Sequence, residues 1–325
     1  MTVRVLDLRA GDYRPHPLHG PDQVWSETNC YVDLWIEVLH ALGYDPVAGL
    51  AFTLSGDFED PQWTFLKPPP DDLRRLWGIE VAEANLWRPL IDVAEEHLGS
   101  GRLVTVEADS WYLPDTTGVS YRLQHVKTTI VPNMVDRAAR RLGYFHGAGY
   151  HELEGDDFDG AIGWEGVGAA SNLAPYLEVV RLAQRHDLAV DVAVGLARTH
   201  LGRRPATNPV TRLATHIQAA LPWVVDQGLD AFHQWAFDTS RQCGANAGLA
   251  AAFADWLIDE DPGAPVGAGD RFREVAEGAK SLQFSLARAV RGRTVDLGVH
   301  LGPMETAWDD AISTLAARYP PPWGL

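Results

Sequence analysis

The feature that most constrains the fold is a change of sequence pattern at the acidic, glycine-rich stretch Glu154–Gly168. Before this stretch, helical and strand-like patterns alternate along the chain. After it the pattern is helical almost throughout, and Asn208 followed by Pro209 is typical of a helix start. The sequence therefore predicts an α+β domain over residues 1–160, followed by an all-helical domain over residues 161–325.

The first helix is predicted from Cys30 to Leu42, because apolar residues recur there at helical spacing and Gly43 ends the run. Three candidate N-caps precede it, Ser26, Thr28 and Asn29. Cys30 therefore falls in the first turn of the helix. Further helices are predicted over Val81–Leu98, Gly244–Ile258 and Asp270–Val290.

Strand patterns occur in the middle of the N-terminal half, where β-branched and apolar residues gather in short runs. They predict strands over Leu103–Ala108, His125–Val131, Leu142–His146 and Gly149–Leu153. The third can return beside the second as a hairpin, and this arrangement would bring His146 close to His125.

The charge and composition exclude several classes of partner. The formal net charge of −17 argues against binding to nucleic acid or to an anionic membrane surface, and favours small molecules or proteins. No apolar run approaches the length of a membrane-spanning helix, and the first residues do not resemble a signal peptide. Two distant cysteines give no disulfide framework, so we expect a cytoplasmic protein.

Cys30 is the candidate nucleophile. A helix N-terminus stabilises a thiolate through its free backbone N–H groups and its positive dipole end. The alternative is that Cys30 is a small buried apolar residue, since free cysteine is often fully buried. Cys243 lies among small residues and is predicted to pack between helices.

His125 is the candidate general base, because it opens a strand directly after a long loop, where a side chain can reach a cleft. His146 is a candidate to orient it through a hydrogen bond. Either histidine can instead be an ordinary strand residue, His125 on the surface and His146 half buried. The spacing of His146, His151 and Glu152 matches no standard metal-ligand motif, so no metal is predicted.

Five segments carry a resemblance to a known family. They are WSETNCYVDLWIEVLHALG, WTFLKPPPDDL, VEADSWYLPDT, YRLQHVKTTI and LGYFHGAGYHELEG. The order of helix-start cysteine, strand-start histidine and orienting residue resembles papain-like peptidases. Through these segments the chain resembles a bacterial family of unknown function, and the resemblance covers nearly the whole chain. That family is related to those peptidases and is often encoded beside amino acid:carrier-protein ligases. The N-terminal half also resembles the butirosin-type acyltransferase, which moves an aminoacyl group from a carrier protein to an amine.

The resemblance implies roles for several residues. Cys30 matches the nucleophile and His125 the base, and the fold is expected to be papain-like. Asp109 matches the acid of an Asp-x-x-Tyr-Leu-Pro loop that includes Tyr112 and lines the substrate pocket; alternatively, Asp109 forms a turn. Peptidases of this type have a glutamine oxyanion donor shortly before the cysteine. Gln23 lies one residue too far, so Asn29 or the Cys30 backbone is the alternative donor.

These observations predict a thiol acyltransferase. Cys30 would take an acyl or aminoacyl group from the phosphopantetheine thioester of a carrier protein and pass it to a small-molecule amine, without a cofactor. Carrier proteins are usually acidic, so docking would need a local basic patch such as Arg137, Arg140 and Arg141. The alternatives are a cysteine hydrolase (thioesterase, amidase or peptidase) using the same site, and a non-catalytic scaffold that binds a carrier protein.

Overall fold

The computed structural model describes residues 2–167 and 173–322. The chain forms two compact units, each assembled from segments that are separate in the sequence. Unit 1 comprises Met1–Pro17, Cys30–Pro46 and Pro69–Leu188, and unit 2 comprises Leu18–Asn29, Val47–Pro68 and Ala189–Leu325. Of the predicted boundary stretch, the structure describes the part up to Val167, and Gly168 lies outside the described residues.

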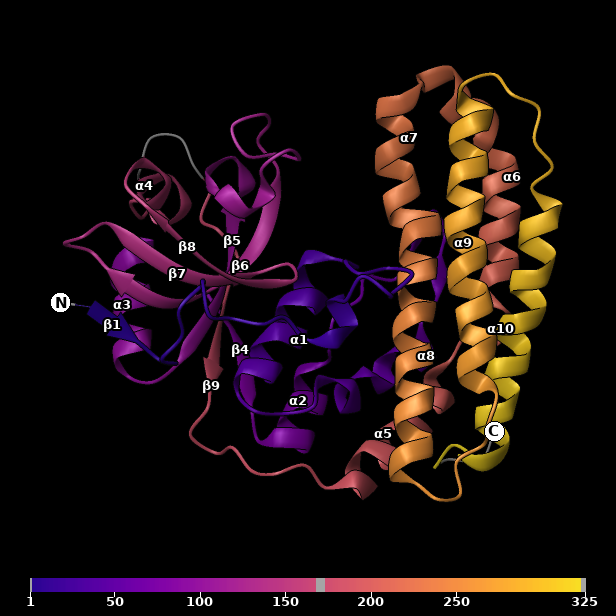
Figure 1. Ribbon diagram of the computed structural model, residues 1–325, viewed down its shortest axis with the longest axis horizontal. Coiled ribbons are helices and arrows are strands. Elements are labelled where there is room, and N and C mark those ends of the chain that lie inside the picture. The colour runs from indigo at the N-terminus through magenta and orange to yellow at the C-terminus, as the bar shows by residue number, and fades with distance from the viewer. Residues whose placement is uncertain (1, 168–172, 323–325) are drawn as a thin grey trace. The chain divides into compact units, whose positions relative to one another are not determined.

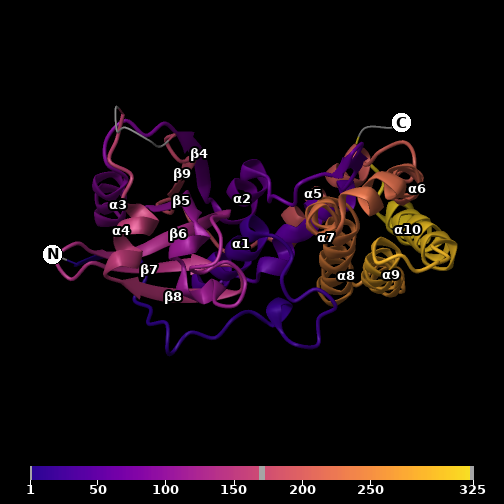
Figure 2. The same ribbon diagram turned by 90° about the horizontal axis from the view of Figure 1, so that it is seen from above.

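Unit 1 is an antiparallel sheet with helices on both sides. Within the described ranges the sheet has seven strands in the order β4-β9-β5-β6-β7-β8, and β1 pairs with β6. Figure 2 shows α3 and α4 on one side of the sheet and α1 and α2 on the other. The strands are β1 (Thr2–Arg4), β4 (Glu80–Ala84), β5 (Leu103–Asp109), β6 (Lys127–Asp136), β7 (Arg141–His146), β8 (Gly149–Glu154) and β9 (Leu177–Arg181).

The helices of unit 1 cover the sheet and hold its connections. Helix α1 packs against β6, β7 and β8, α2 against β4, α3 against β5 and β6, and α4 against β5 and β8. Two short 3₁₀ helices follow β5 directly. The bounds are α1 (Cys30–Ala41), α2 (Pro70–Trp77), α3 (Leu90–Gly99), η3 (Ser110–Tyr112), η4 (Pro114–Thr116) and α4 (Asp156–Ile162).

Unit 2 is mainly helical. Helix α9 packs against both α8 and α10, and α6 packs against α7 (Figure 1). Five residues of π-helix, η5, join α7 to α8. The elements are η2 (Pro46–Ser55), β2 (Phe58–Glu59), β3 (Gln62–Trp63), α5 (Val190–Arg203), α6 (Pro209–Gln227), α7 (Leu229–Ala236), η5 (Phe237–Arg241), α8 (Gln242–Glu260), α9 (Ala268–Val290) and α10 (Gly298–Arg318); η1 (Pro17–His19) lies where the chain passes from unit 1 to unit 2.

The α+β class with a helical C-terminal part is confirmed, and so are most of the predicted elements. Helix α1 begins at Cys30 as predicted. The Asn208 side chain caps α6 by accepting a hydrogen bond from the backbone N–H of Val210 at 2.8 Å, with Pro209 in the first turn. Cys243 is fully buried in α8, as expected for a packing cysteine. No helix in the described part of the chain is both long and apolar enough to cross a membrane.

One helix prediction is wrong, and the extent of the first unit also differs from expectation. The stretch Val81–Leu98 is not one helix, because Glu80–Ala84 forms β4 and a helix begins only after Pro89, whose ring cannot sit in a helix interior. Strand β9, which lies beyond residue 160, pairs between β4 and β5 and so extends unit 1 to Leu188.

Candidate functional site

The candidate site lies in unit 1 at the end of β5, where the chain turns into η3. Strand β5 pairs antiparallel with β6, and Asp109 is opposite Lys127. This register brings the last residue of β5 close to the residues that lead into β6. His125, two residues before β6, therefore lies within hydrogen-bonding distance of Asp109.

The His125 ring is held on two sides. Its Nδ1 lies 2.5 Å from Oδ2 of Asp109. Its plane stacks on the Trp111 ring, with 4.6 Å between the ring centroids and 10° between the planes. An ionised carboxylate can only accept hydrogen bonds, so Nδ1 carries the proton and the lone pair of the neutral ring lies on Nε2. The imidazole side chain is 65% exposed, and Nε2 is therefore suited to take a proton from another group.

Asp109 supports both the base and the turn. Its Oδ1 accepts a hydrogen bond from the backbone N–H of Trp111 at 3.0 Å, which caps η3, while Oδ2 faces His125. Asp109 therefore forms the expected turn, and it does so through one carboxylate oxygen, Oδ1. The other oxygen, Oδ2, makes the orienting contact with His125 that was predicted for His146.

A cavity of about 690 Å³ opens beside this pair. Asp109, His125 and Tyr112 line it together with residues of β5, β6 and α4. Lys127 Nζ lies 2.9 Å from Glu107 Oε1 in its wall. Burial raises the pKa of Glu107, but its hydrogen bonds with Lys127 and with the backbone N–H of Tyr176 outweigh this and hold the pKa below its usual range.

His146 belongs to a second, buried cluster. Its Nδ1 lies 2.5 Å from Oδ2 of Asp115, and its Nε2 lies 2.8 Å from Oγ1 of Thr128. Tyr144 donates its hydroxyl hydrogen to the other oxygen of Asp115. Both ring nitrogens of His146 are therefore engaged, and neither faces His125. Burial raises the pKa of Asp115, yet the hydrogen bond and charge of His146 bring it below its usual value.

The remaining predicted residues lie elsewhere. Cys30 is half-buried at the start of α1 and does not line the cavity. Among the described residues, no hydrogen bond joins its sulfur to His125. Asn29 belongs to unit 2, where its side-chain N–H groups bond to Leu66 O and Gln242 Oε1. Gln23 lines a separate cavity of about 300 Å³ in unit 2.

The basic patch expected on the β6–β7 turn is neutralised by acidic neighbours. Arg137 pairs with Asp92 and Glu95, Arg140 pairs with Asp156 and Asp159, and Arg141 pairs with Glu152. Five carboxylates thus surround three guanidinium groups. Within residues 2–167 and 173–322, no group of three or more His, Cys, Asp or Glu side chains is arranged to hold a metal ion.

Fold and site together define an α+β protein with an exposed His–Asp pair that lines a cavity. Comparison with protein families gives a more specific assignment. The DUF1839 N-terminal domain matches residues 14–182, and the DUF1839 C-terminal domain matches residues 186–317. The chain therefore belongs to the DUF1839 family, a family of unknown function. No match to the chain is found among curated proteins.

Proposed function

We propose that the protein is a thiol-dependent acyltransferase with a papain-like catalytic domain. In this proposal Cys30 is the nucleophile, His125 the general base and Asp109 the group that orients the base. The contact of 2.5 Å between His125 Nδ1 and Asp109 Oδ2 carries the proposal, because it fixes the tautomer that a general base requires. The stacked Trp111 ring limits the rotation of the same imidazole.

The place of Cys30 supports its role. It is the first residue of α1 and is partly exposed, so its sulfur lies at the positive end of a helix dipole. The second cysteine offers a direct contrast. Cys243 is fully buried, and burial raises the pKa of its thiol well above the ordinary range. Of the two thiols, Cys30 is therefore the one suited to nucleophilic attack.

Helix α1 also lies on the face of the sheet to which Asp109 belongs. Tyr31, next to Cys30, donates its hydroxyl hydrogen to Glu178, and Thr105 donates to the same carboxylate at 2.8 Å. Side chains alternate along a strand, so Thr105, Glu107 and Asp109 share one face of β5. Cys30 and Asp109 thus belong to the same side of the sheet, and the proposed cycle requires the thiol and His125 Nε2 to approach when substrate binds.

The proposed cycle has two proton-balanced halves. In the first, His125 Nε2 takes the Cys30 proton, the thiolate attacks a thioester carbonyl, and the donor thiol leaves with that proton as the acyl-Cys30 bond forms. In the second, an amine attacks the acyl-enzyme and gives its proton to His125. The carbon–sulfur bond then breaks, an amide is released, and Cys30 regains its proton. No metal or redox group takes part in this cycle.

The donor in this proposal is an acyl or aminoacyl group on the phosphopantetheine arm of a carrier protein, and the acceptor is a small-molecule amine. The acceptor is proposed to bind in the cavity beside His125, where Glu107 and Asp109 provide carboxylates. The neutralised arginines of the β6–β7 turn lead us to exclude that turn as the docking surface for the donor.

Hydrolysis is the second candidate. The exposure of His125 leaves its Nε2 accessible to water, which can resolve the same acyl-enzyme. The nucleophile, base and orienting acid are unchanged, and only the acceptor differs.

Intact-protein mass spectrometry tests the proposal. The protein is incubated with an aminoacyl thioester of N-acetylcysteamine, which presents the thioester without a carrier protein. We expect a mass increase of one acyl group that persists in Cys243→Ser and disappears in Cys30→Ser. Amide formation on addition of an amine supports transfer, and free acid in its place supports hydrolysis. A protein that folds but acquires no acyl group even with a carrier-bound thioester supports the scaffold alternative and contradicts the proposal.

A further inference from the structure

Arg122 has an unusual backbone conformation close to the candidate base. Its φ is +55°, and among the described non-glycine residues only Arg122 and Arg140 have a positive φ. L-residues with a side chain rarely adopt this conformation, so surrounding contacts must hold it. The backbone N–H of Arg122 donates to the carbonyl oxygen of Trp111 at 3.2 Å, and this bond closes the loop between η3 and His125.

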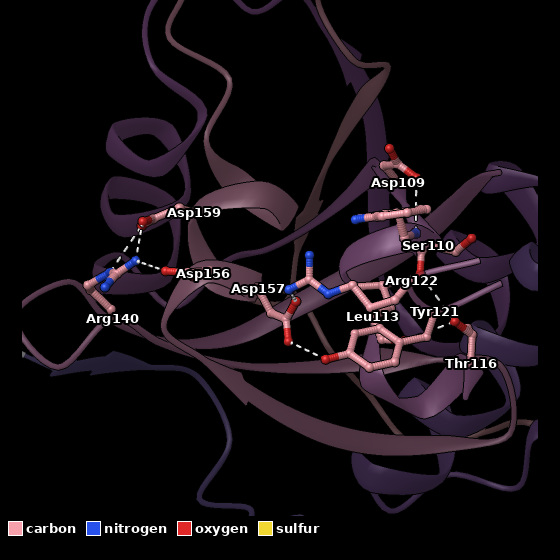
Figure 3. Close-up of polar contacts among 11 residues, drawn as sticks. Asp109, Ser110, Leu113, Thr116, Tyr121, Arg122, Arg140, Asp156, Asp157 and Asp159 are labelled. Atoms are coloured by element: carbon pink, nitrogen blue, oxygen red, sulfur yellow. Dashed lines mark hydrogen bonds and ion pairs between the residues drawn. The ribbon is translucent and has the colours of Figure 1, made fainter. Parts of the chain in front are cut away.

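The guanidinium of Arg122 makes a second set of contacts. Its carbon lies 5.4 Å from the ring centroids of both Tyr112 and Tyr121. One of its N–H groups bonds to Asp157 Oδ1, and Tyr121 donates its hydroxyl hydrogen to Asp157 Oδ2 at 2.9 Å. Figure 3 shows Arg122 and Tyr121 converging on this carboxylate. Asp157 is only 13% exposed, so the ion pair is partly shielded from water.

These contacts join three segments around the site. Tyr112 and Trp111 belong to η3, Arg122 to the loop before His125, and Asp157 to α4. Helix α4 lies directly against Tyr112, since a Cβ atom on Gly160 would be 2.0 Å from the Tyr112 ring. The side chain of Arg122 thus adds a polar link between α4 and η3 to their direct contact through Gly160 and Tyr112.

We propose that Arg122 is a positioning residue, which fixes Trp111 and through it the orientation of His125 against Asp109. Trp111 acts on the imidazole in two ways, because its ring stacks on His125 and its backbone N–H binds Asp109. The exposed imidazole has few other restraints. This inference deepens the proposed function, since His125 is the proposed base, but its test needs no turnover.

The tautomer of the neutral His125 ring is the decisive measurement. ¹H–¹⁵N spectra of imidazole-labelled protein distinguish a proton on Nδ1 from one on Nε2, and His125→Gln assigns the signal. Arg122→Gly removes the side chain while tolerating the positive φ. We expect the Nδ1–H form to predominate in the wild type and to become the minority form in Arg122→Gly, because free histidine favours Nε2–H.

Arg140 provides a matched control. It also has a positive φ, of +50°, and also pairs with carboxylates of α4, Asp156 and Asp159, but neither pair involves η3 (Figure 3). Arg140→Gly should therefore leave the His125 tautomer unchanged. Asp157→Asn removes the charge that pairs with Arg122 and leaves every loop residue in place, although it also changes the acceptor of the Tyr121 hydroxyl. It should shift the tautomer in the same direction as Arg122→Gly, and it covers the case in which that variant fails to fold.

Several results would overturn the inference. A wild-type tautomer in folded Arg122→Gly or in folded Asp157→Asn would do so, and so would equal shifts in Arg122→Gly and Arg140→Gly. Loss of Cys30 reactivity is a separate result. If Cys30 proves inert while the tautomer shifts as expected, the proposed acyl transfer fails and the positioning role of Arg122 stands.

Discussion

Two of the His–Asp pairs in the described part of unit 1 make the same contact in different surroundings. In each pair the histidine Nδ1 lies 2.5 Å from an aspartate oxygen. The side chains of His125 and Asp109 are 65% and 34% exposed, whereas those of His146 and Asp115 are 10% and 9% exposed. The outer pair, His125–Asp109, leaves the histidine Nε2 available. In the inner pair, His146–Asp115, the histidine Nε2 contacts Thr128 Oγ1. At His125 the His–Asp contact therefore orients a proposed base. At His146 the same contact holds the η4 segment against the sheet.

The largest expected difference between the two pairs is in catalysis. His125→Ala should lower the rate of Cys30 acylation about 10²- to 10⁴-fold, the usual contribution of a positioned general base. His146→Ala should lower it only in proportion to the loss of folded protein. Stopped-flow or quenched-flow acylation on preparations of known folded fraction measures both rates. Similar rate losses per folded molecule in the two variants would remove the distinction between the pairs.

The two pairs should rank in the opposite order for stability: a change in the inner pair should destabilise the protein more than a change in the outer pair. Asp115→Asn places an amide where one carboxylate binds both His146 and Tyr144. We expect a loss of about 3 kcal/mol in the free energy of unfolding, as for breaking a buried charged contact. Asp109→Asn should cost less than about 1 kcal/mol, because its pair is exposed, while reducing acyl transfer. Urea unfolding and activity measured on one preparation separate the effects; a destabilised Asp109→Asn with normal activity per folded molecule would exclude Asp109 from the site.

The pH dependence of stability tests whether the ionised carboxylate of the inner pair stabilises the fold. The pKa of Asp115 is lower in the folded protein than its ordinary value. Its ionised form therefore stabilises the fold above the unfolded pKa, about 4, and this contribution is lost as the pH falls through the lower folded value. The stability difference between wild type and Asp115→Asn should thus be largest near neutral pH and narrow below about pH 4. A difference that widens in acid would contradict this assignment.

The smallest effect concerns the stacked ring. A double-mutant cycle between Trp111→Leu and His125→Ala should give a coupling energy of about 1 kcal/mol in unfolding, as for an aromatic pair. The cycle between Trp111→Leu and His146→Ala should give a coupling near zero, since the two rings share no contact in the described structure. Equal coupling energies in the two cycles would show that stacking on Trp111 does not stabilise His125 specifically.

Local sequence signals predicted much of this fold. The apolar spacing after Cys30 and the Asn208–Pro209 pair each identified a helix start correctly. The β6–β7 pairing follows from two adjacent strand patterns joined by a short turn. Strand β9 was missed because five residues within a largely helical region carry too little pattern, and its place between β4 and β5 depends on non-local pairing.

The candidate site was predictable only in part, for the same reason. His125 and Asp109 were both singled out, but as a base and a substrate-binding acid. Their contact depends on the register of β5 with β6 across a long loop, which no local pattern specifies. The neighbouring strand suggested His146 as the partner of His125, yet alternation along β7 turns His146 towards Asp115. Arg122 and Trp111 lie in segments that carry the resemblance, but no role was predicted for either, and their roles follow from their contacts.

The rate of alkylation at Cys30 shows whether His125 activates this thiol. Iodoacetamide labelling at neutral pH, followed by peptide mass spectrometry, gives separate rates for Cys30 and Cys243 in the wild type, in His125→Ala and in His146→Ala. We expect Cys30 to react much faster than Cys243. His125→Ala should slow the reaction of Cys30, and His146→Ala should not slow it in folded protein. A Cys30 that is as protected as Cys243, or whose rate is unchanged by His125→Ala, would contradict a thiol activated by this histidine.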